Sequence, residues 1–334
     1  MKPFLIVCLL LPHAQTSQRV AELIKDLESA KIETRREAIE DLAKLGEDAK
    51  PAVPALAKAL KDANAGVRTA AAKTLGILAE HAQGARLALA GALEDKEPKV
   101  RRYAAYALKQ MGREAKEAIP ALVKALKNRD AETRCLAADA LGRMGEHAKP
   151  AVAALAGILE DTEAGPHAAE ALARLGDVAR DALPALAAAL KNSDVRGYAA
   201  QALAKLGALQ PLAKALGDKD EDVRVEVVLA LRPLGRPAVP VLVGALRDKS
   251  DEVRMNAAAT LGKMGATAAD AVAALAAALK DDNDEVRHQA AIALGAIGPG
   301  AKAAVPQLNA ARADKAQRVR QAAREALDLI RGKP

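Results

Sequence analysis

Histidine and cysteine, the residue types that most often act as nucleophiles, proton shuttles or transition-metal ligands, are few in this chain, with five and two copies. None of the five histidines is followed by a glutamate. They are His13, His81, His147, His167 and His288. A nucleophilic thiol needs a nearby base or cation. The arginine beside Cys135 is expected to point into the fold, and no histidine is expected close to the thiol. We therefore predict no catalytic residue, no metal ligand and no cofactor.

A recurring segment would position any functional side chain. In its clearest copy, Asp248 to Gly265, an acidic turn precedes Val253-Arg254 and an Ala/Leu-rich helix. The aligned arginines are Arg35, Arg68, Arg101, Arg134, Arg196, Arg224, Arg254, Arg287 and Arg320. A degenerate copy has Gly165 at this anchor position, and a leucine follows every anchor after seven residues. Because the anchors are 28 to 33 residues apart, the period predicts an α-solenoid of about ten repeats.

Each repeat is expected to contain two helices. The first begins near a proline, as in the segment Pro54 to Leu60, because the first helical turn does not need the missing N–H group. The second begins at a capping residue and ends at a glycine. The predicted caps are Asn64, Asp130, Asn192, Asp220, Ser250 and Asn283. The predicted terminal glycines are Gly46, Gly112, Gly145, Gly176, Gly207, Gly235, Gly265 and Gly298. This alternation predicts an all-α chain. The core positions of the second helix are mostly alanine, and such small side chains allow close helix packing.

The N-terminal segment differs from the repeats. Residues 1–16 contain Lys2, an apolar run from Phe4 to Leu11, and then small or polar residues. This pattern is typical of a secretory signal peptide, and the run is too short for a transmembrane helix. We expect residues 17–334 to form a single solenoid that is exported to the periplasm or the extracellular space. If the segment is instead an apolar tail, the protein is cytoplasmic.

The repeated motif runs from an aspartate to Val-Arg-x-x-Ala-Ala-x-Ala-Leu-Gly and then Met, Leu or Ile before a final Gly. It resembles HEAT repeats, most closely the HEAT-like repeats named after phycobilisome lyases, over about residues 20–331. The resemblance implies a right-handed α-solenoid, an α-α superhelix. The family includes scaffolds, bilin lyases, deoxyhypusine hydroxylase and some DNA-repair glycosylases, so the fold alone implies no single activity.

The resemblance also implies a structural role for the recurring arginine and for the aspartate six positions before it. An Asp in the turn and an Arg at the start of the second helix can form a charge-assisted contact within a repeat or between neighbouring repeats. Within a repeat, Arg254 would pair with Asp248. The alternative is a row of phosphate-binding arginines. The predicted Asp/Arg ladder comprises Asp62, Arg68, Asp95, Arg101, Asp218, Arg224, Asp248, Arg254, Asp281, Arg287, Asp314 and Arg320.

Three tyrosines stand out among the side chains of the repeats. Tyr103, Tyr106 and Tyr198 lie two or five residues after an anchor position, where most other repeats have a charged or polar residue. These positions are expected to face solvent on the second helix, which lines the concave face of HEAT-like stacks. Exposed Tyr beside Arg and apolar residues is typical of binding hot spots. The alternative is that the rings fill gaps between repeats. The predicted partner-binding residues are Arg102, Tyr103, Tyr106, Gln110, Leu136 and Tyr198.

Composition leaves three classes of function. The formal net charge is +7, and aromatic residues make up 1% of the chain, with no Trp. We favour a non-enzymatic, monomeric scaffold that binds a protein or peptide on its concave face. A HEAT-like enzyme of the bilin-lyase or deoxyhypusine-hydroxylase type would need a metal or cofactor site that the sequence does not provide. An anion or nucleic-acid binder would use the basic residues 101–150, but the modest charge and the lack of aromatic platforms argue against it.

Overall fold

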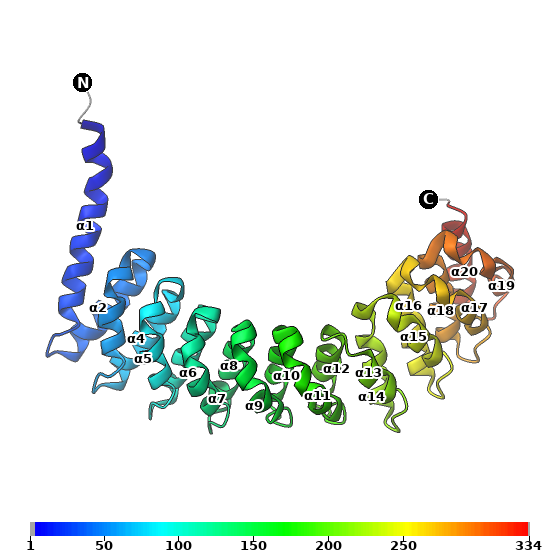
Figure 1. Ribbon diagram of the computed structural model, residues 1–334. Helices are drawn as coiled ribbons and strands as arrows, with labels where there is room; N and C mark the ends of the chain where they lie inside the picture. Colours follow the sequence, from blue (N-terminus) through cyan, green and yellow to red (C-terminus); the bar gives the residue numbers. More distant parts are fainter. Residues whose placement is uncertain (1–3, 333–334) are drawn as a thin grey trace. The chain divides into compact units, whose positions relative to one another are not determined.

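The computed structural model describes residues 4–332, with side chains described from residue 15, and these residues contain helices and turns but no β-strand. The helices alternate in pairs, which we call the A helix and the B helix of each repeat (Figure 1). The chain divides into two compact units: unit 1 ends at Ala182 and unit 2 begins at Leu183. The predicted all-α solenoid of two-helix repeats is confirmed.

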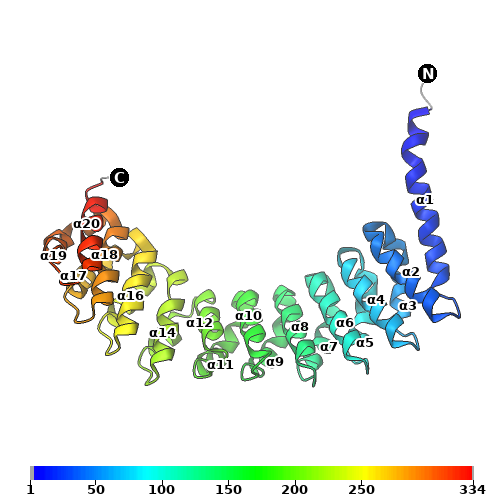
Figure 2. The same cartoon turned by 180° about the vertical axis from the view of Figure 1, so that it is seen from behind.

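Within each unit, consecutive B helices pack side by side, and each A helix packs on the B helix that follows it (Figure 2). The A helices of unit 1 are α1 (Phe4–Asp26), α3 (Val53–Ala59), α5 (Arg86–Ala92), α7 (Ile119–Ala125) and α9 (Val152–Ala156). Its B helices are α2 (Ile32–Lys44), α4 (Ala65–Ile77), α6 (Pro98–Met111), α8 (Ala131–Gly142) and α10 (Gly165–Leu175).

Unit 2 repeats the same arrangement. Its A helices are α11 (Leu183–Ala189), α13 (Leu209–Ala215), α15 (Val239–Ala245), α17 (Val272–Ala278) and α19 (Val305–Ala311). Its B helices are α12 (Arg196–Lys205), α14 (Glu221–Ala230), α16 (Asp251–Met264), α18 (Asp284–Ile297) and α20 (Gln317–Ile330).

The core of each repeat is built on the leucine seven residues after the anchor. These leucines are at most 3% exposed. They are Leu42, Leu75, Leu108, Leu141, Leu172, Leu203, Leu231, Leu261, Leu294 and Leu327. The alanines around them are also buried, and small side chains allow helix axes to approach to about 8 Å. The repeat period therefore identified the core correctly.

Helix starts follow the predicted capping chemistry in five of six repeats. Asn64, Asp130, Asp220, Ser250 and Asn283 each accept a backbone N–H from the first turn of their B helix. The sixth predicted cap was wrong. The Oδ1 of Asn192 accepts the N–H of Asp194, but α12 begins only at Arg196 and its N-cap residue is Val195.

The glycines predicted to end the B helices share one backbone feature. All eight predicted glycines have positive φ, between 55° and 69°. For example, Gly265 has φ 56° and ψ −136°, a combination that glycine adopts because it lacks a Cβ. This conformation turns the chain sharply into the segment that leads to the next A helix.

In most repeats that segment consists of 3₁₀ turns, which the sequence interpretation did not foresee. In unit 2, η9 (Gly265–Ala271) buries Ala268 and Ala271, and in unit 1, η4 (Gly112–Ala118) buries Ala115 and Ala118. The backbone is non-helical at Ala268, with φ −91° and ψ 18°, and at Ala115, with φ −101° and ψ 21°, so each segment is two 3₁₀ turns that meet at a kink. The remaining 3₁₀ segments are η1 (Gly46–Ala52), η2 (Ala79–His81), η3 (Gln83–Ala85), η5 (Gly145–Ala151), η6 (Gly176–Ala182), η7 (Arg232–Leu234), η8 (Arg236–Ala238) and η10 (Gly298–Ala304).

The predicted signal segment falls mainly on residues whose side chains are not described. Residues 1–3 lie outside the described residues, and side chains are described only from residue 15. The backbone of α1 is helical from Phe4 to Asp26 and continues across the predicted boundary at residue 16. Export therefore stays a prediction.

The Asp/Arg ladder joins neighbouring repeats. In unit 2, the Nε and Nη2 atoms of Arg254 donate to the two carboxylate oxygens of Asp281, at 2.7 and 2.9 Å. Its Nη1 donates to the backbone carbonyl of Asp248 at 2.9 Å, so the predicted side-chain pairing of Arg254 with Asp248 was wrong. The carboxylate of Asp248 pairs instead with Arg224 of the preceding repeat. Each such arginine thus donates to the backbone of the turn in its own repeat and to the aspartate carboxylate in the turn of the next repeat. The contacts of this kind are Arg35–Asp62, Arg68–Asp95, Arg134–Asp161, Arg224–Asp248, Arg254–Asp281 and Arg287–Asp314.

Three predicted ladder residues have no ion pair among the described residues: Arg101, Asp218 and Arg320. Arg320 lies in the last repeat and donates only to backbone carbonyls. Asp218 follows Arg196 by only 22 residues, and Arg196 pairs with Asp220 and Asp222 instead. The ladder is therefore interrupted where the repeats shorten or a chemical partner is missing.

The interruption at Arg101 has a local cause. The residue 27 positions later is Asn128 instead of aspartate. The Oδ1 of Asn128 accepts the N–H of Asp130 at 3.0 Å, as the aspartates do in the other turns. The Nη1 of Arg101 still reaches the carbonyl of Asp95, but its buried Nε has no hydrogen-bond partner in the part of the chain that the structure describes. An amide can offer only one oxygen, so one acceptor is missing.

Replacing Asn128 with aspartate should supply this acceptor. We expect the free energy of unfolding to rise by about 1–2 kcal/mol, because a charge-assisted hydrogen bond would satisfy a buried donor. Urea denaturation measures the change. Asn192→Asp is a matched control, because the residue 27 positions before Asn192 is Gly165, which has no side chain. Equal effects of the two substitutions would show that the gain does not come from Arg101.

Candidate binding groove on the B helices

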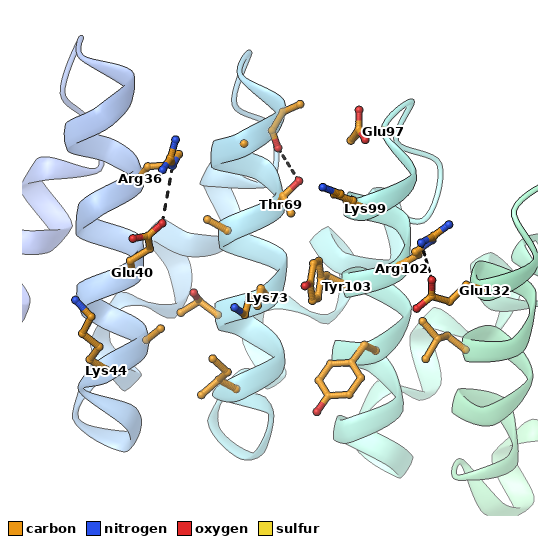
Figure 3. Close-up of a pocket in the computed structure, with 18 residues that line it drawn as sticks. Arg36, Glu40, Lys44, Thr69, Lys73, Glu97, Lys99, Arg102, Tyr103 and Glu132 are labelled. Carbon is orange, nitrogen blue, oxygen red and sulfur yellow. Dashed lines mark hydrogen bonds and ion pairs between the residues drawn. The ribbon is translucent and has the colours of Figure 1, made fainter.

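A groove crosses the B helices α2, α4, α6 and α8 of unit 1. It has a volume of about 960 Å³, at the upper end of the range for ligand sites. Figure 3 shows its labelled side chains projecting from neighbouring helices into one open space. Apolar residues of the groove include Ile77, Tyr103, Tyr106 and Leu136. The B helices are close-packed, so a side chain on one helix lies beside those of the next.

Tyr106 lies across the junction between α6 and α4. A Cβ built on Gly76 would lie 3.0 Å from the Cδ1 of Tyr106, so the glycine makes room for the ring. The Nε2 of Gln110 donates to the Tyr106 hydroxyl at 2.7 Å, and the Nη1 of Arg143 donates to the Oε1 of Gln110 at 3.1 Å. The ring is nevertheless 38% exposed. One edge of the Tyr106 ring and its hydroxyl are thus held by the protein, while the exposed remainder is available to a partner.

Ile77 is the most exposed apolar side chain of the groove. It is 54% exposed and lies at the end of α4, next to Gly76. The sequence interpretation missed it, although the signal was the same as for the tyrosines. Nine residues after the anchor, most other repeats have a charged or polar residue, for example Lys44, Gln110 and Arg143. Ile77 therefore replaces a polar residue with an apolar one at a solvent-facing position.

Arg102 connects the groove to the adjoining helix α8. Its Nε donates to the Oδ2 of Asp130 at 2.9 Å, and its Nη1 lies 2.6 Å from the Oε2 of Glu132. Its guanidinium and the hydroxyl and N–H groups of Thr133 hold the pKa of Asp130 well below its usual range, although burial opposes them. Two lysines of the groove, Lys73 and Lys99, are exposed and form no ion pair with the described residues. Their charges are available to a ligand.

The structure brings together most of the predicted binding residues. Arg102, Tyr103, Tyr106 and Leu136 line the groove, and Gln110 supports Tyr106 from outside it. Tyr103 and Leu136 are half-buried, which agrees in part with the alternative that these side chains fill gaps between repeats. Tyr198 lies on α12 in unit 2, where it is 49% exposed, so it is not part of this groove.

A second pocket, of about 490 Å³, contains both Cys135 and His167. The expectation that no histidine lies near this thiol was therefore wrong. The Nδ1 of His167 is 3.0 Å from the Oδ1 of Asp139, and the Nζ of Lys109 donates to its Oδ2 at 2.6 Å. Burial raises the pKa of Asp139, but these hydrogen bonds outweigh it and lower the pKa to about 2. Burial raises the pKa of the Cys135 thiol, so the thiol is protonated at neutral pH and is not activated as a nucleophile.

The described residues form neither a metal-binding cluster nor a membrane-spanning helix. Within the described part of the chain, no group of three or more His, Cys, Asp and Glu side chains is placed to hold a metal ion. None of the described helices has both the length and the apolar character needed to cross a membrane.

Paired helices, a shared leucine core and a groove across the B helices define this protein as an α-solenoid repeat protein. The family model for HEAT repeats matches residues 20–88, 85–166, 209–272 and 266–328. The model for the PBS lyase HEAT-like repeat matches residues 167–192. Because these matches cover most of the sequence, the chain belongs to the HEAT-repeat family. The resemblance inferred from the repeated motif is confirmed.

Solved structures show the same fold. An engineered protein is 25% identical, with a TM-score of 0.50 over 95% of this chain and 100% of its own. The karyopherin Kap121p bound to the extreme C-terminus of the protein phosphatase Cdc14p is 16% identical, with a TM-score of 0.64 over 94% of this chain. Kap121p bound to Nup53p is 15% identical, with a TM-score of 0.64 over 96% of this chain. The chain spans only 42% and 41% of the karyopherin in these two structures, and at such identities the likeness concerns the fold alone. No curated protein matches the sequence.

Proposed function

We propose that this protein is a non-enzymatic scaffold that binds a segment of a partner protein, or a peptide, in the groove over α2, α4, α6 and α8. One observation carries the proposal: Ile77 and Tyr106 line the same groove and are 54% and 38% exposed, whereas most of the other side chains that line it are polar or charged. Partly exposed aromatic and aliphatic side chains surrounded by polar residues are typical of interaction hot spots.

The groove supports binding better than catalysis. Its carboxylates Glu40 and Glu132 lie within ion-pair distance of Arg36 and Arg102, at 3.9 and 2.6 Å. Two of the similar structures contain a bound protein: Kap121p with the extreme C-terminus of Cdc14p, and Kap121p with Nup53p. They support a binding role for this fold.

The test compares two double variants of the full chain as affinity baits. Ile77→Ser/Tyr106→Ser removes the apolar surface of the groove. Leu229→Ser/Ile292→Ser removes exposed apolar side chains from α14 and α18 of unit 2, where they are 43% and 42% exposed. Partners captured from the source organism are identified by quantitative mass spectrometry, and folding is checked by circular dichroism.

We expect the groove variant to lose its principal partner by a factor on the order of ten or more, as hot-spot truncations do. The unit 2 variant should retain it. Capture of the same proteins in equal amounts by both variants and by the unmodified chain would contradict the proposal. Capture that disappears at about 0.2 M salt, in a fraction sensitive to nuclease, would favour an anion or nucleic-acid binder instead.

A further inference from the structure

We propose that the segment bound in this groove is acidic as well as apolar. Its aspartate or glutamate side chains neutralise Lys73 and Lys99, and an adjoining aliphatic or aromatic side chain packs on Ile77 and Tyr106. The inference rests on the proposed function, because it assigns the chemistry of the partner to the same groove.

The groove carries an excess of positive charge. Cationic side chains outnumber anionic ones among the residues that line it, five to three. The cations are Arg36, Lys44, Lys73, Lys99 and Arg102, and the anions are Glu40, Glu97 and Glu132.

Several of these charges already form ion pairs within the protein. Arg36 lies near Glu40, Lys44 pairs with Asp41, and Arg102 pairs with Asp130 and Glu132. Lys73 on α4 and Lys99 on α6 form no ion pair within the described residues, and both are exposed. Among the groove anions, Glu97 likewise forms no ion pair within the described residues, but it is half-buried at the N-cap position of α6. The unpaired charge that a ligand meets is therefore mainly positive.

Lys73 lies next to the exposed apolar side chain of Ile77. Lys73 and Ile77 are four residues apart on α4, so they are neighbours on one face of the helix. A ligand side chain that covers Ile77 must partly desolvate the ammonium group of Lys73. Desolvating an unpaired charge is costly, whereas an opposite charge compensates for it. The groove thus favours acidic segments and rejects basic ones, by the same physical effect.

A single-stranded nucleic acid would use this surface poorly. Such ligands need several phosphate contacts and aromatic faces on which bases can stack. Among the described residues, only two groove lysines lack an ion pair, Tyr103 is half-buried, and one edge of the Tyr106 ring lies against Gly76. Ile77 and Leu136 complement aliphatic side chains better than they complement a sugar-phosphate backbone.

The experiment selects peptides without knowledge of the natural partner. A phage-displayed library of random linear 12-residue peptides is panned on the immobilised full chain, and the selected peptides are synthesised with a fluorescent label. Their affinities are measured by fluorescence anisotropy for four variants in addition to the unmodified chain. These are Ile77→Ser/Tyr106→Ser, Lys73→Gln/Lys99→Gln, Lys73→Glu/Lys99→Glu, and the control Lys205→Gln/Lys263→Gln, whose lysines are exposed on unit 2.

We expect the selected peptides to carry Asp or Glu close to Leu, Ile, Phe or Trp. Affinity should fall on the order of tenfold in Lys73→Gln/Lys99→Gln and remain unchanged in the control. Panning on Lys73→Glu/Lys99→Glu should select basic peptides, a reversal that a merely structural role of the lysines would not produce.

The outcomes separate this inference from the proposed function. Peptides that depend on Ile77 and Tyr106 but lack acidic residues, or that bind Lys73→Gln/Lys99→Gln as well as the unmodified chain, would overturn the inference alone. Peptides whose binding survives Ile77→Ser/Tyr106→Ser would overturn the proposed function. Lysine-dependent binding of labelled oligothymidine, with no peptide selected, would overturn both.

Discussion

Arg254→Ala is expected to lower the free energy of unfolding by about 2–4 kcal/mol, because removing one member of a largely buried ion pair leaves the other uncompensated. The side chains of Arg254 and Asp281 are only 16% and 12% exposed. The substitution also leaves the carbonyls of Asp248 and Lys249 without the Nη1 donor. The loss therefore affects both the turn of the same repeat and the contact with the next.

Arg320→Ala is the matched control for this substitution. Arg320 makes the equivalent hydrogen bonds to the carbonyls of Asp314 and Lys315 but has no carboxylate partner among the described residues. Its removal should cost only about 1 kcal/mol, the usual net value of such hydrogen bonds. Urea denaturation of both variants gives the comparison. Equal losses would show that the carboxylate contact contributes little to stability.

The loss caused by Arg254→Ala should also depend on pH. Burial raises the pKa of Asp281, but the hydrogen bonds from Arg254 and from the backbone of Asn283 outweigh it and hold the pKa below its usual value. A carboxyl group with a lowered folded-state pKa stabilises the fold above its unfolded-state pKa. This contribution is lost as the pH falls through the folded-state value. The difference between Arg254→Ala and the unmodified chain should therefore be full at neutral pH and should narrow below about pH 4.

The sequence predicted the repeats and their core because both depend on local periodicity. A leucine at a fixed distance from each anchor can only face the inside of a stack, and a glycine at each helix end can only be a turn. The direction of the Arg254 contact could not be predicted in this way. Asp248 and Asp281 are both within reach of a long side chain, and the choice between them depends on how far each repeat is displaced from the next. The spacing of residues along the sequence does not determine that displacement.

The binding groove was predicted only in part for a related reason. Tyrosines at positions that are polar in most other repeats pointed to Tyr103, Tyr106 and the adjacent Arg102. The same comparison across repeats would have identified Ile77. Pairing of charges, however, depends on side chains from different helices. That Arg102 is used by Asp130 and Glu132, whereas Lys73 has no ion pair among the described residues, becomes visible only when α4, α6 and α8 are placed side by side.

The close approach of the B helices leads to a further expectation, that Gly142→Ala destabilises the protein. Gly142 is the last residue of α8 and is buried against α10. A Cβ at this position would lie 2.7 Å from the Cα of Ala171 and 2.8 Å from its Cβ. Backbone atoms cannot give way as a flexible side chain can, so α8 and α10 would have to separate. We expect a loss of about 1–3 kcal/mol, the usual cost of overpacking a core.

Gly91→Ala provides the opposite case. Gly91 lies in α5, and a Cβ there would have no atom within 4 Å. Alanine is a better helix former than glycine, so this variant should gain about 0.5–1 kcal/mol. Gly262→Ala is expected to fall between the two, since its Cβ would lie 3.1 Å from the Cα of Ala293. Urea denaturation gives the order of the three variants, and hydrogen exchange should show faster opening of α8 and α10 in Gly142→Ala. If Gly142→Ala is as stable as Gly91→Ala, the helices have room to separate, and glycine at this position is not required by packing.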